Sequence, residues 1–259
     1  MSDENKSRNN QTFEDKNSEK NENEKVFEAE LDDEEQNEEE KKTEHVVRAV
    51  EAILASNENI IRIAETARKY GDSAKTEHLK LKRAARYIIR RYSNLAAAAG
   101  GAAAIPSLIP GIGKLYSIFG GSIVDVVSTL KFEVEMALCL CSLFGYDITQ
   151  ERERKLAFLL ASSAISDIYA PKDSKIRSFL EVIDIAMWEY SSRQITKSML
   201  KIFGQAVYLF TTKRFLKLMP VIGIAVGASV NKIVTAHAGM KCTDALFERK
   251  AYINAKINE

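Results

Sequence analysis

Apolar side chains recur every three to four residues along the first strongly patterned part of the chain. They stand at Val46, Val47, Val50, Ile53, Leu54, Ile60, Ile61 and Ala64. This spacing places them on one side of an α-helix, so the pattern predicts a helix that ends near Tyr70 and Gly71. We expect a second helix to begin after Asp72 or Ser73, because either side chain can cap a first helical turn.

The second predicted helix combines this periodicity with positive charge. Between Arg68 and Arg91 there are nine basic and two acidic residues, with apolar residues such as Leu81, Ile88 and Tyr92 among them. A basic amphipathic helix of this kind suits an anionic bilayer surface. The candidate membrane-surface residues are Lys80, Lys82, Arg83, Arg86, Arg90 and Arg91. A solvated helix face is the alternative interpretation. Nucleic acid is disfavoured because no nucleic-acid-binding motif accompanies the basic residues.

An uncharged segment of 22 residues follows, from Tyr92 to Gly113. Its length could cross a bilayer. Its alanines and glycines contribute little insertion energy, however, and Pro106 and Pro110 interrupt a helix. Three interpretations stay open: a re-entrant or in-plane hairpin, a tightly packed soluble core, and a true membrane span.

A helix is predicted next, from about Gly113 to Phe144. Lys114, Ser122, Asp125, Thr129 and Glu133 fall on one polar stripe of it. Asp125 stands among branched apolar residues, and an isolated buried acid is costly. We therefore expect it to face water or to pair with Lys114, Lys131 or a basic residue of another helix. A functional acid is the alternative interpretation.

The second half of the chain continues the helical pattern. Glu151 to Tyr169 predicts an amphipathic helix with the charged residues from Glu151 to Lys155 facing outward. An apolar run of 13 residues, 218–230, is too short to span a bilayer alone. The closing stretch from Phe247 to Tyr252 is polar and predicted helical.

Two groups of candidate residues emerge. For apolar packing or insertion they are Gly100, Gly101, Pro106, Pro110, Gly111, Gly113, Gly120, Gly121, Pro220, Gly223 and Gly227, and for interhelical polar contacts they are Lys114, Asp125, Glu133 and Asn231.

The net charge of +1 is the sum of two unlike parts. Residues 1–44 carry a formal charge of −10 and few apolar side chains, which predicts a disordered acidic tail. Residues 45–259 carry +11 and form the predicted helical domain. The fold class expected is all-α, a compact multi-helix bundle. The first residues lack the basic and apolar regions of a signal peptide, which favours the cytoplasm or the cytoplasmic side of a membrane.

No arrangement of reactive residues indicates an enzyme. His45, His78 and His237 fall in no metal-binding motif, and Cys139 and Cys141 point to different sides of a helix. The sequence therefore predicts no catalytic residue, no metal site and no cofactor.

Several short motifs together resemble the EcsC family. They are the Pro106–Gly111 stretch after an Ala/Gly-rich segment, a long helix with an acid, Phe144-Gly145-Tyr146-Asp147, and the run from Leu218 to Asn231 with Gly239 beyond it. The chain is also similar to helical domains attached to small bacterial GTPases. The resemblance covers residues 80–250. It implies an all-helical, membrane-associated protein and transfers no catalytic residue.

These observations favour a non-enzymatic accessory or scaffold protein at a membrane surface. The basic helix would supply attraction to anionic lipid, and segments 95–124 and 218–230 would supply packing or insertion. Two alternatives stay open. One is a soluble helical module for protein–protein interaction or homo-oligomerisation, and the other is a membrane-perturbing or pore-forming protein.

Overall fold

The computed structural model describes residues 41, 43–99, 121–169, 188, 190–211 and 228–258. Within these ranges the chain is helical or lies in short connections, without a strand, which confirms the predicted all-α bundle. Residues 43–53 are helical, and the remaining helices are α2 (Asn57–Gly71), α3 (Glu77–Ala99), α6 (Gly121–Leu143), α7 (Glu151–Tyr169), α9 (Ser192–Thr211) and α11 (Ala228–Ile257). The chain divides into two units, 1–42 and 43–259, and the helices belong to the second.

The single helix predicted from Val46 to Tyr70 is wrong, because the chain breaks between residues 54 and 56. Ser56 caps α2 by accepting a hydrogen bond from the backbone N–H of Asn59. The backbone N–H of Ala55 donates to Oε1 of Glu135 on α6, at 2.6 Å. The break is therefore stabilised by a local cap and by a carboxylate from a distant helix.

The helix expected to follow Asp72 or Ser73 begins later, at Glu77. The Thr76 hydroxyl accepts a hydrogen bond from the Leu79 N–H at 3.3 Å. Gly71, the last residue of α2, lies so close to α3 that a β-carbon there would collide with the Lys80 carbonyl group. A residue without a β-carbon lets the two helices approach at this point.

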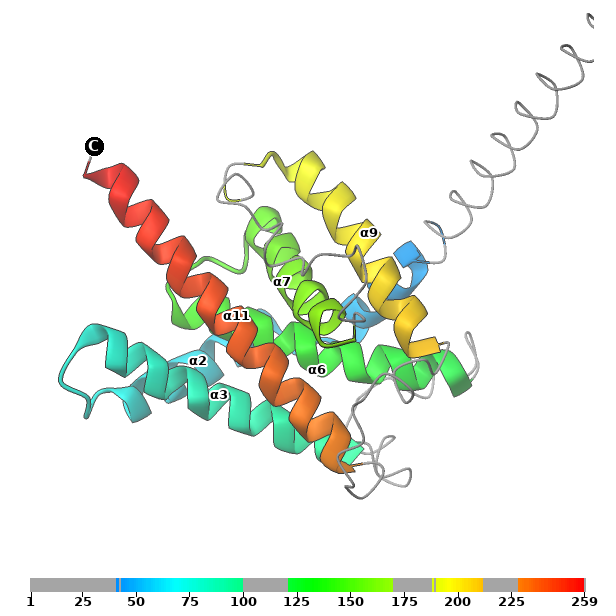
Figure 1. The fold of residues 1–259 in the computed structure, drawn as a ribbon, viewed down its shortest axis with the longest axis horizontal. Helices are drawn as coiled ribbons and strands as arrows, with labels where there is room; N and C mark the ends of the chain where they lie inside the picture. The colour runs from blue at the N-terminus through cyan, green and yellow to red at the C-terminus, as the bar shows by residue number, and fades with distance from the viewer. Residues whose placement is uncertain are drawn as a thin grey trace, which may run out of the picture. The chain divides into compact units, whose positions relative to one another are not determined.

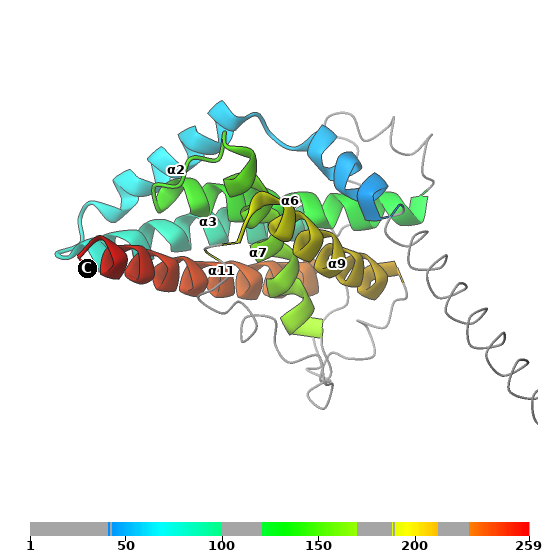
Figure 2. The ribbon, with the colours of Figure 1, turned by 90° about the horizontal axis from the view of Figure 1, so that it is seen from above.

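The helix α6 packs against all five of the other named helices (Figures 1 and 2). Every residue from Leu130 to Cys141 is buried, including Lys131, Glu133 and Glu135. A helix that is covered all round forms the centre of a bundle. Gly145 ends it with a φ of 94°, and the Tyr146 and Gly145 N–H groups bond to the carbonyls of Cys141 and Ser142, the pattern of a Schellman cap.

Three helices cover one side of α6: α2, α3 and α11, with α3 in contact with both neighbours. Tyr70 stacks on Tyr87 where α2 meets α3, with ring centroids 4.4 Å apart. His78 lies against Phe247 where α3 meets α11, also at 4.4 Å. A β-carbon on Gly239 of α11 would lie 2.7 Å from Cγ1 of Ile89. These contacts show that α3 and α11 run antiparallel, and we call the three helices the α2–α3–α11 layer.

Several predictions fall on residues outside the described ranges. They concern the acidic tail, most of the uncharged segment after α3, and the apolar run 218–227. Among the helices of the described residues, none is long and apolar enough to cross a membrane.

Candidate basic surface

The basic residues of α3 lie on the side that faces away from the bundle. The apolar positions are buried in the core, at Leu81, Ala84, Ala85, Ile88, Ile89 and Tyr92. On the opposite side Lys82, Arg83, Arg86, Arg90 and Arg91 are exposed, and Lys80 is half-buried. We call these five exposed residues the basic face. From His78 to Ala99 the helix has no acidic residue, so nothing on α3 itself neutralises them.

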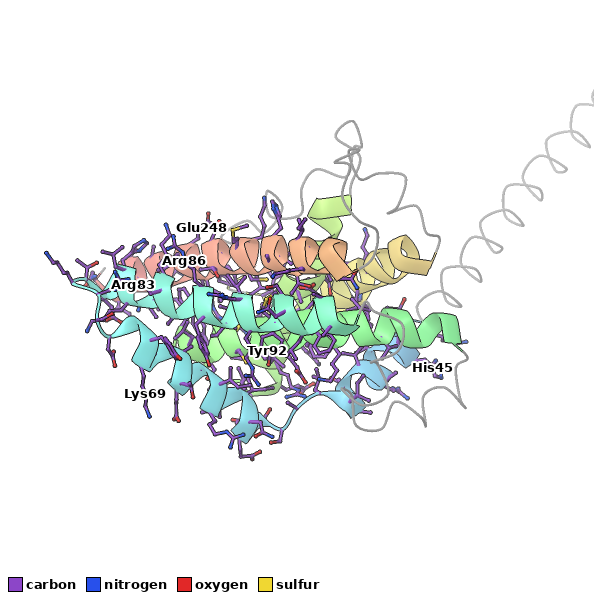
Figure 3. All side chains as sticks on the ribbon, turned by 90° about the horizontal axis from the view of Figure 1, so that it is seen from below. His45, Lys69, Arg83, Arg86, Tyr92 and Glu248 are labelled. Atoms are coloured by element: carbon purple, nitrogen blue, oxygen red, sulfur yellow. The ribbon has the colours of Figure 1, made fainter. Side chains whose placement is uncertain are left out.

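Figure 3 shows α3 between α2 and α11, with Arg83 and Arg86 labelled on it. Arg83 donates a hydrogen bond to the Ser73 hydroxyl at 3.0 Å, which ties one guanidinium to the α2–α3 connection. Glu248 on α11 is exposed near the start of α3. Because the apolar side of α3 is packed inside the bundle, the helix can offer a partner its charged side.

The predicted interhelical residue Glu133 is fully buried and contacts α11. Its Oε1 accepts a hydrogen bond from the Thr235 hydroxyl at 2.7 Å, while its Oε2 has no hydrogen-bond partner. Burial raises the pKa of the Glu133 carboxyl to about 7, against a smaller lowering effect of the Thr235 hydrogen bond. Loss of water stabilises the neutral form of a carboxyl group, so Glu133 holds a proton more tightly here than in water.

Lys131, one of the partners considered for Asp125, pairs with Glu135 instead. Its Nζ lies 2.5 Å from Oε1 of Glu135, and both side chains are buried. The same oxygen accepts the hydrogen bond from Ala55. This buried pair therefore joins α6 to the break before α2.

The structure describes only some of the remaining predicted site residues. Gly121 is the first residue of α6, Asp125 lies on α6 with its side chain outside the described part, and Asn231 is half-buried on α11. The others lie outside the described residues, namely Gly100, Gly101, Pro106, Pro110, Gly111, Gly113, Lys114, Gly120, Pro220, Gly223 and Gly227.

The prediction that Glu153 faces outward is wrong. Glu153 is buried and holds both terminal nitrogens of Arg249, at 2.6 and 2.7 Å. The Arg249 guanidinium also lies over the Tyr146 ring, 3.8 Å from its centroid, and nearer to it than to the Trp188 ring at 5.1 Å. Arg152 adds a contact to Glu153 at 3.0 Å. This cluster links α7 to α11. The sequence did not predict it, because the residues around Glu153 have the composition of a polar helix surface.

The three cysteines are free and buried. Burial raises the pKa of both the Cys139 and the Cys141 thiols to about 12. Burial likewise raises the pKa of Cys242. A thiol must ionise to act as a nucleophile or to bind a metal, and burial in an apolar core opposes that ionisation. In the described part of the chain, no three His, Cys, Asp or Glu residues cluster as metal ligands would.

A small hollow of about 170 Å³ lies between the end of α2 and the start of α3. Arg68, Asp72, Glu77 and Lys80 line it together with apolar groups. Arg68 uses one nitrogen to donate to the Leu143 carbonyl, at 2.6 Å. With two acidic and two basic side chains, the hollow selects neither an anion nor a cation.

Comparison with protein-family models, with curated proteins and with solved structures found no match. The resemblance to the EcsC family therefore stays a prediction. The fold and the surface define the class of this protein at the level of an all-α bundle that presents a basic helix to its surroundings.

Proposed function

We propose that this protein is a non-enzymatic accessory or scaffold protein that binds the surface of an anionic membrane through the basic face of α3. The observation that carries the proposal is the exposure of Lys82, Arg83, Arg86, Arg90 and Arg91 on one helix without an intervening acid. Each Lys or Arg near an anionic bilayer contributes about 1 kcal/mol of attraction. The resemblance to the EcsC family supports the same function.

The burial of α3 determines how such binding would work. A helix that lies within a bilayer surface buries its apolar side among the lipids. Here that side is occupied by the core, through Ile88, Ile89 and Tyr92. Attraction through the basic face therefore requires no unfolding of the bundle, and it depends on salt because the charges are exposed.

The test compares two triple variants with the same spacing and the same change in charge. Lys82→Gln, Arg86→Gln and Arg90→Gln remove three positive charges from α3, and Arg193→Gln, Lys197→Gln and Lys201→Gln remove three exposed ones from α9. At about 1 kcal/mol per charge, the α3 variant should bind vesicles with roughly 30% anionic lipid roughly a hundredfold more weakly. The α9 variant should bind like the wild type.

The measurement is co-sedimentation with anionic and with zwitterionic vesicles, at about 0.1 M and about 0.5 M salt. Wild-type protein should prefer the anionic vesicles and lose affinity at the higher salt. Equal loss in the two triple variants would show that only net charge matters. No binding by the wild type would refute the proposed function.

A further inference from the structure

The exposed large apolar side chains lie on the same helices as the basic face. Among the described residues there are five of them: Tyr70, Leu79, Ile233, Met240 and Ile257. All five belong to α2, α3 or α11, and the described side chains of α7 and α9 include none. Single exposed apolar residues are common on protein surfaces and need no explanation. Their restriction to one layer does need an explanation, because the same layer carries the basic face.

Ile233 and Met240 stand seven residues apart and thus lie on one side of α11, with 52% and 51% of their surfaces exposed. Met240 directly follows Gly239, which lies against Ile89 of α3. The contacts of Ile89 with Gly239 and of His78 with Phe247 fix the register of the two helices. This register places the N-terminal half of α11 beside the C-terminal half of α3, where Arg90 and Arg91 are exposed.

In this region the exposed charged residues of α3 and α11 are all positive. From Ala228 to Thr243 α11 has no acidic residue, and it adds the exposed Lys232 to the basic residues of α3. Exposed acids appear later on α11, at Asp244 and Glu248, toward the start of α3. On α3 and α11, the half that holds Ile233 and Met240 is therefore the half whose exposed charge is positive.

We propose that Ile233 and Met240 enter the headgroup region of an anionic bilayer while the basic face binds its phosphates. This inference rests on the proposed function and adds the orientation of the contact, which spans α3 and the N-terminal half of α11. Apolar burial persists in salt that screens charge attraction. The contact therefore has a salt-sensitive part from the arginines and lysines and a salt-resistant part from two apolar side chains.

The test uses the full-length chain with Ile233→Ser and Met240→Ser combined. The matched control is Ile257→Ser on the same helix, a more exposed apolar residue ten positions beyond Phe247. Binding to vesicles of phosphatidylcholine and phosphatidylserine is measured at low and at high salt. The double variant should bind roughly tenfold more weakly and lose the salt-resistant part. The control should bind like the wild type, and all three proteins should unfold at the same temperature.

The outcomes separate this inference from the proposed function. If the α3 triple variant loses binding while the Ile233/Met240 variant binds like the wild type, the basic face is the whole contact and the inference is wrong. An equal effect of Ile257→Ser would also overturn it, because the loss would then not depend on position. If wild-type protein ignores anionic vesicles, the proposed function itself fails.

Discussion

The carboxyl group of Glu133 has one oxygen bonded to Thr235 and one oxygen without a partner in the core. Its pKa is raised from 4.5 to about 7, so the folded state binds this proton more tightly than the unfolded state does. The resulting stabilisation is fully present below about pH 4.5 and declines as the pH rises toward 7. Above that range the folded protein contains a charged carboxylate in its centre.

Glu133→Gln should remove this dependence while preserving an oxygen that can accept the Thr235 hydrogen bond. We expect the free energy of unfolding of the wild type to fall by about 3 kcal/mol relative to the variant between pH 4.5 and 8. Urea unfolding at several pH values measures the difference. Parallel pH profiles for the two proteins would contradict the raised pKa.

At the residue scale, the sequence does not reveal which charged side chains are buried. Glu153 and Arg249 are 96 residues apart, and each lies in a stretch that looks like polar helix surface. Nothing in the local pattern distinguishes them from exposed neighbours, because burial here depends on a partner from a distant helix. The exposed arginines and lysine of the basic face, by contrast, lie opposite the apolar positions of their own helix, so periodicity could locate them.

At the scale of helices, periodicity predicted the amphipathic α3 and the helical class of the chain, and it missed the break before α2. Ser56 with the acidic Glu58 in the first turn carries a local start signal. The helical spacing of apolar residues continues on both sides of Ser56, and this continuity suggested one helix. The second support of the break, the bond from Ala55 to Glu135, joins residues 80 positions apart and has no sequence signature.

The approach of α2 to α3 depends on Gly71. Gly71→Ala places a methyl group against the Lys80 carbonyl, which belongs to the backbone and moves only if the helices separate. Gly204→Ala is the control, because its methyl group would meet only the side chain of Thr43, 2.9 Å from the hydroxyl oxygen. We expect Gly71→Ala to lower the free energy of unfolding by about 2 kcal/mol more than Gly204→Ala does. Equal losses in chemical denaturation would show that the close approach is unimportant.

At the scale of the molecule, α6 forms the centre and the α2–α3–α11 layer carries both the basic face and the exposed apolar residues. The described side chains of α9 that are exposed are polar, with Arg193, Lys197 and Lys201 among them. Sequence alone indicated a basic helix for a membrane surface. It could not place Ile233 and Met240 beside that helix, because their position depends on how α11 packs against Ile89.

The central claim is that the side of the protein carrying α3 touches the membrane. The three native cysteines are buried, so a thiol-reactive fluorophore can be directed to Asn94→Cys on α3 or to Ser192→Cys on α9, both at exposed positions. Each labelled protein is bound to anionic vesicles whose lipid headgroups carry a quencher. The fluorophore at position 94 should be quenched and the one at position 192 should not. Equal quenching at both positions, or stronger quenching at 192, would contradict the claim.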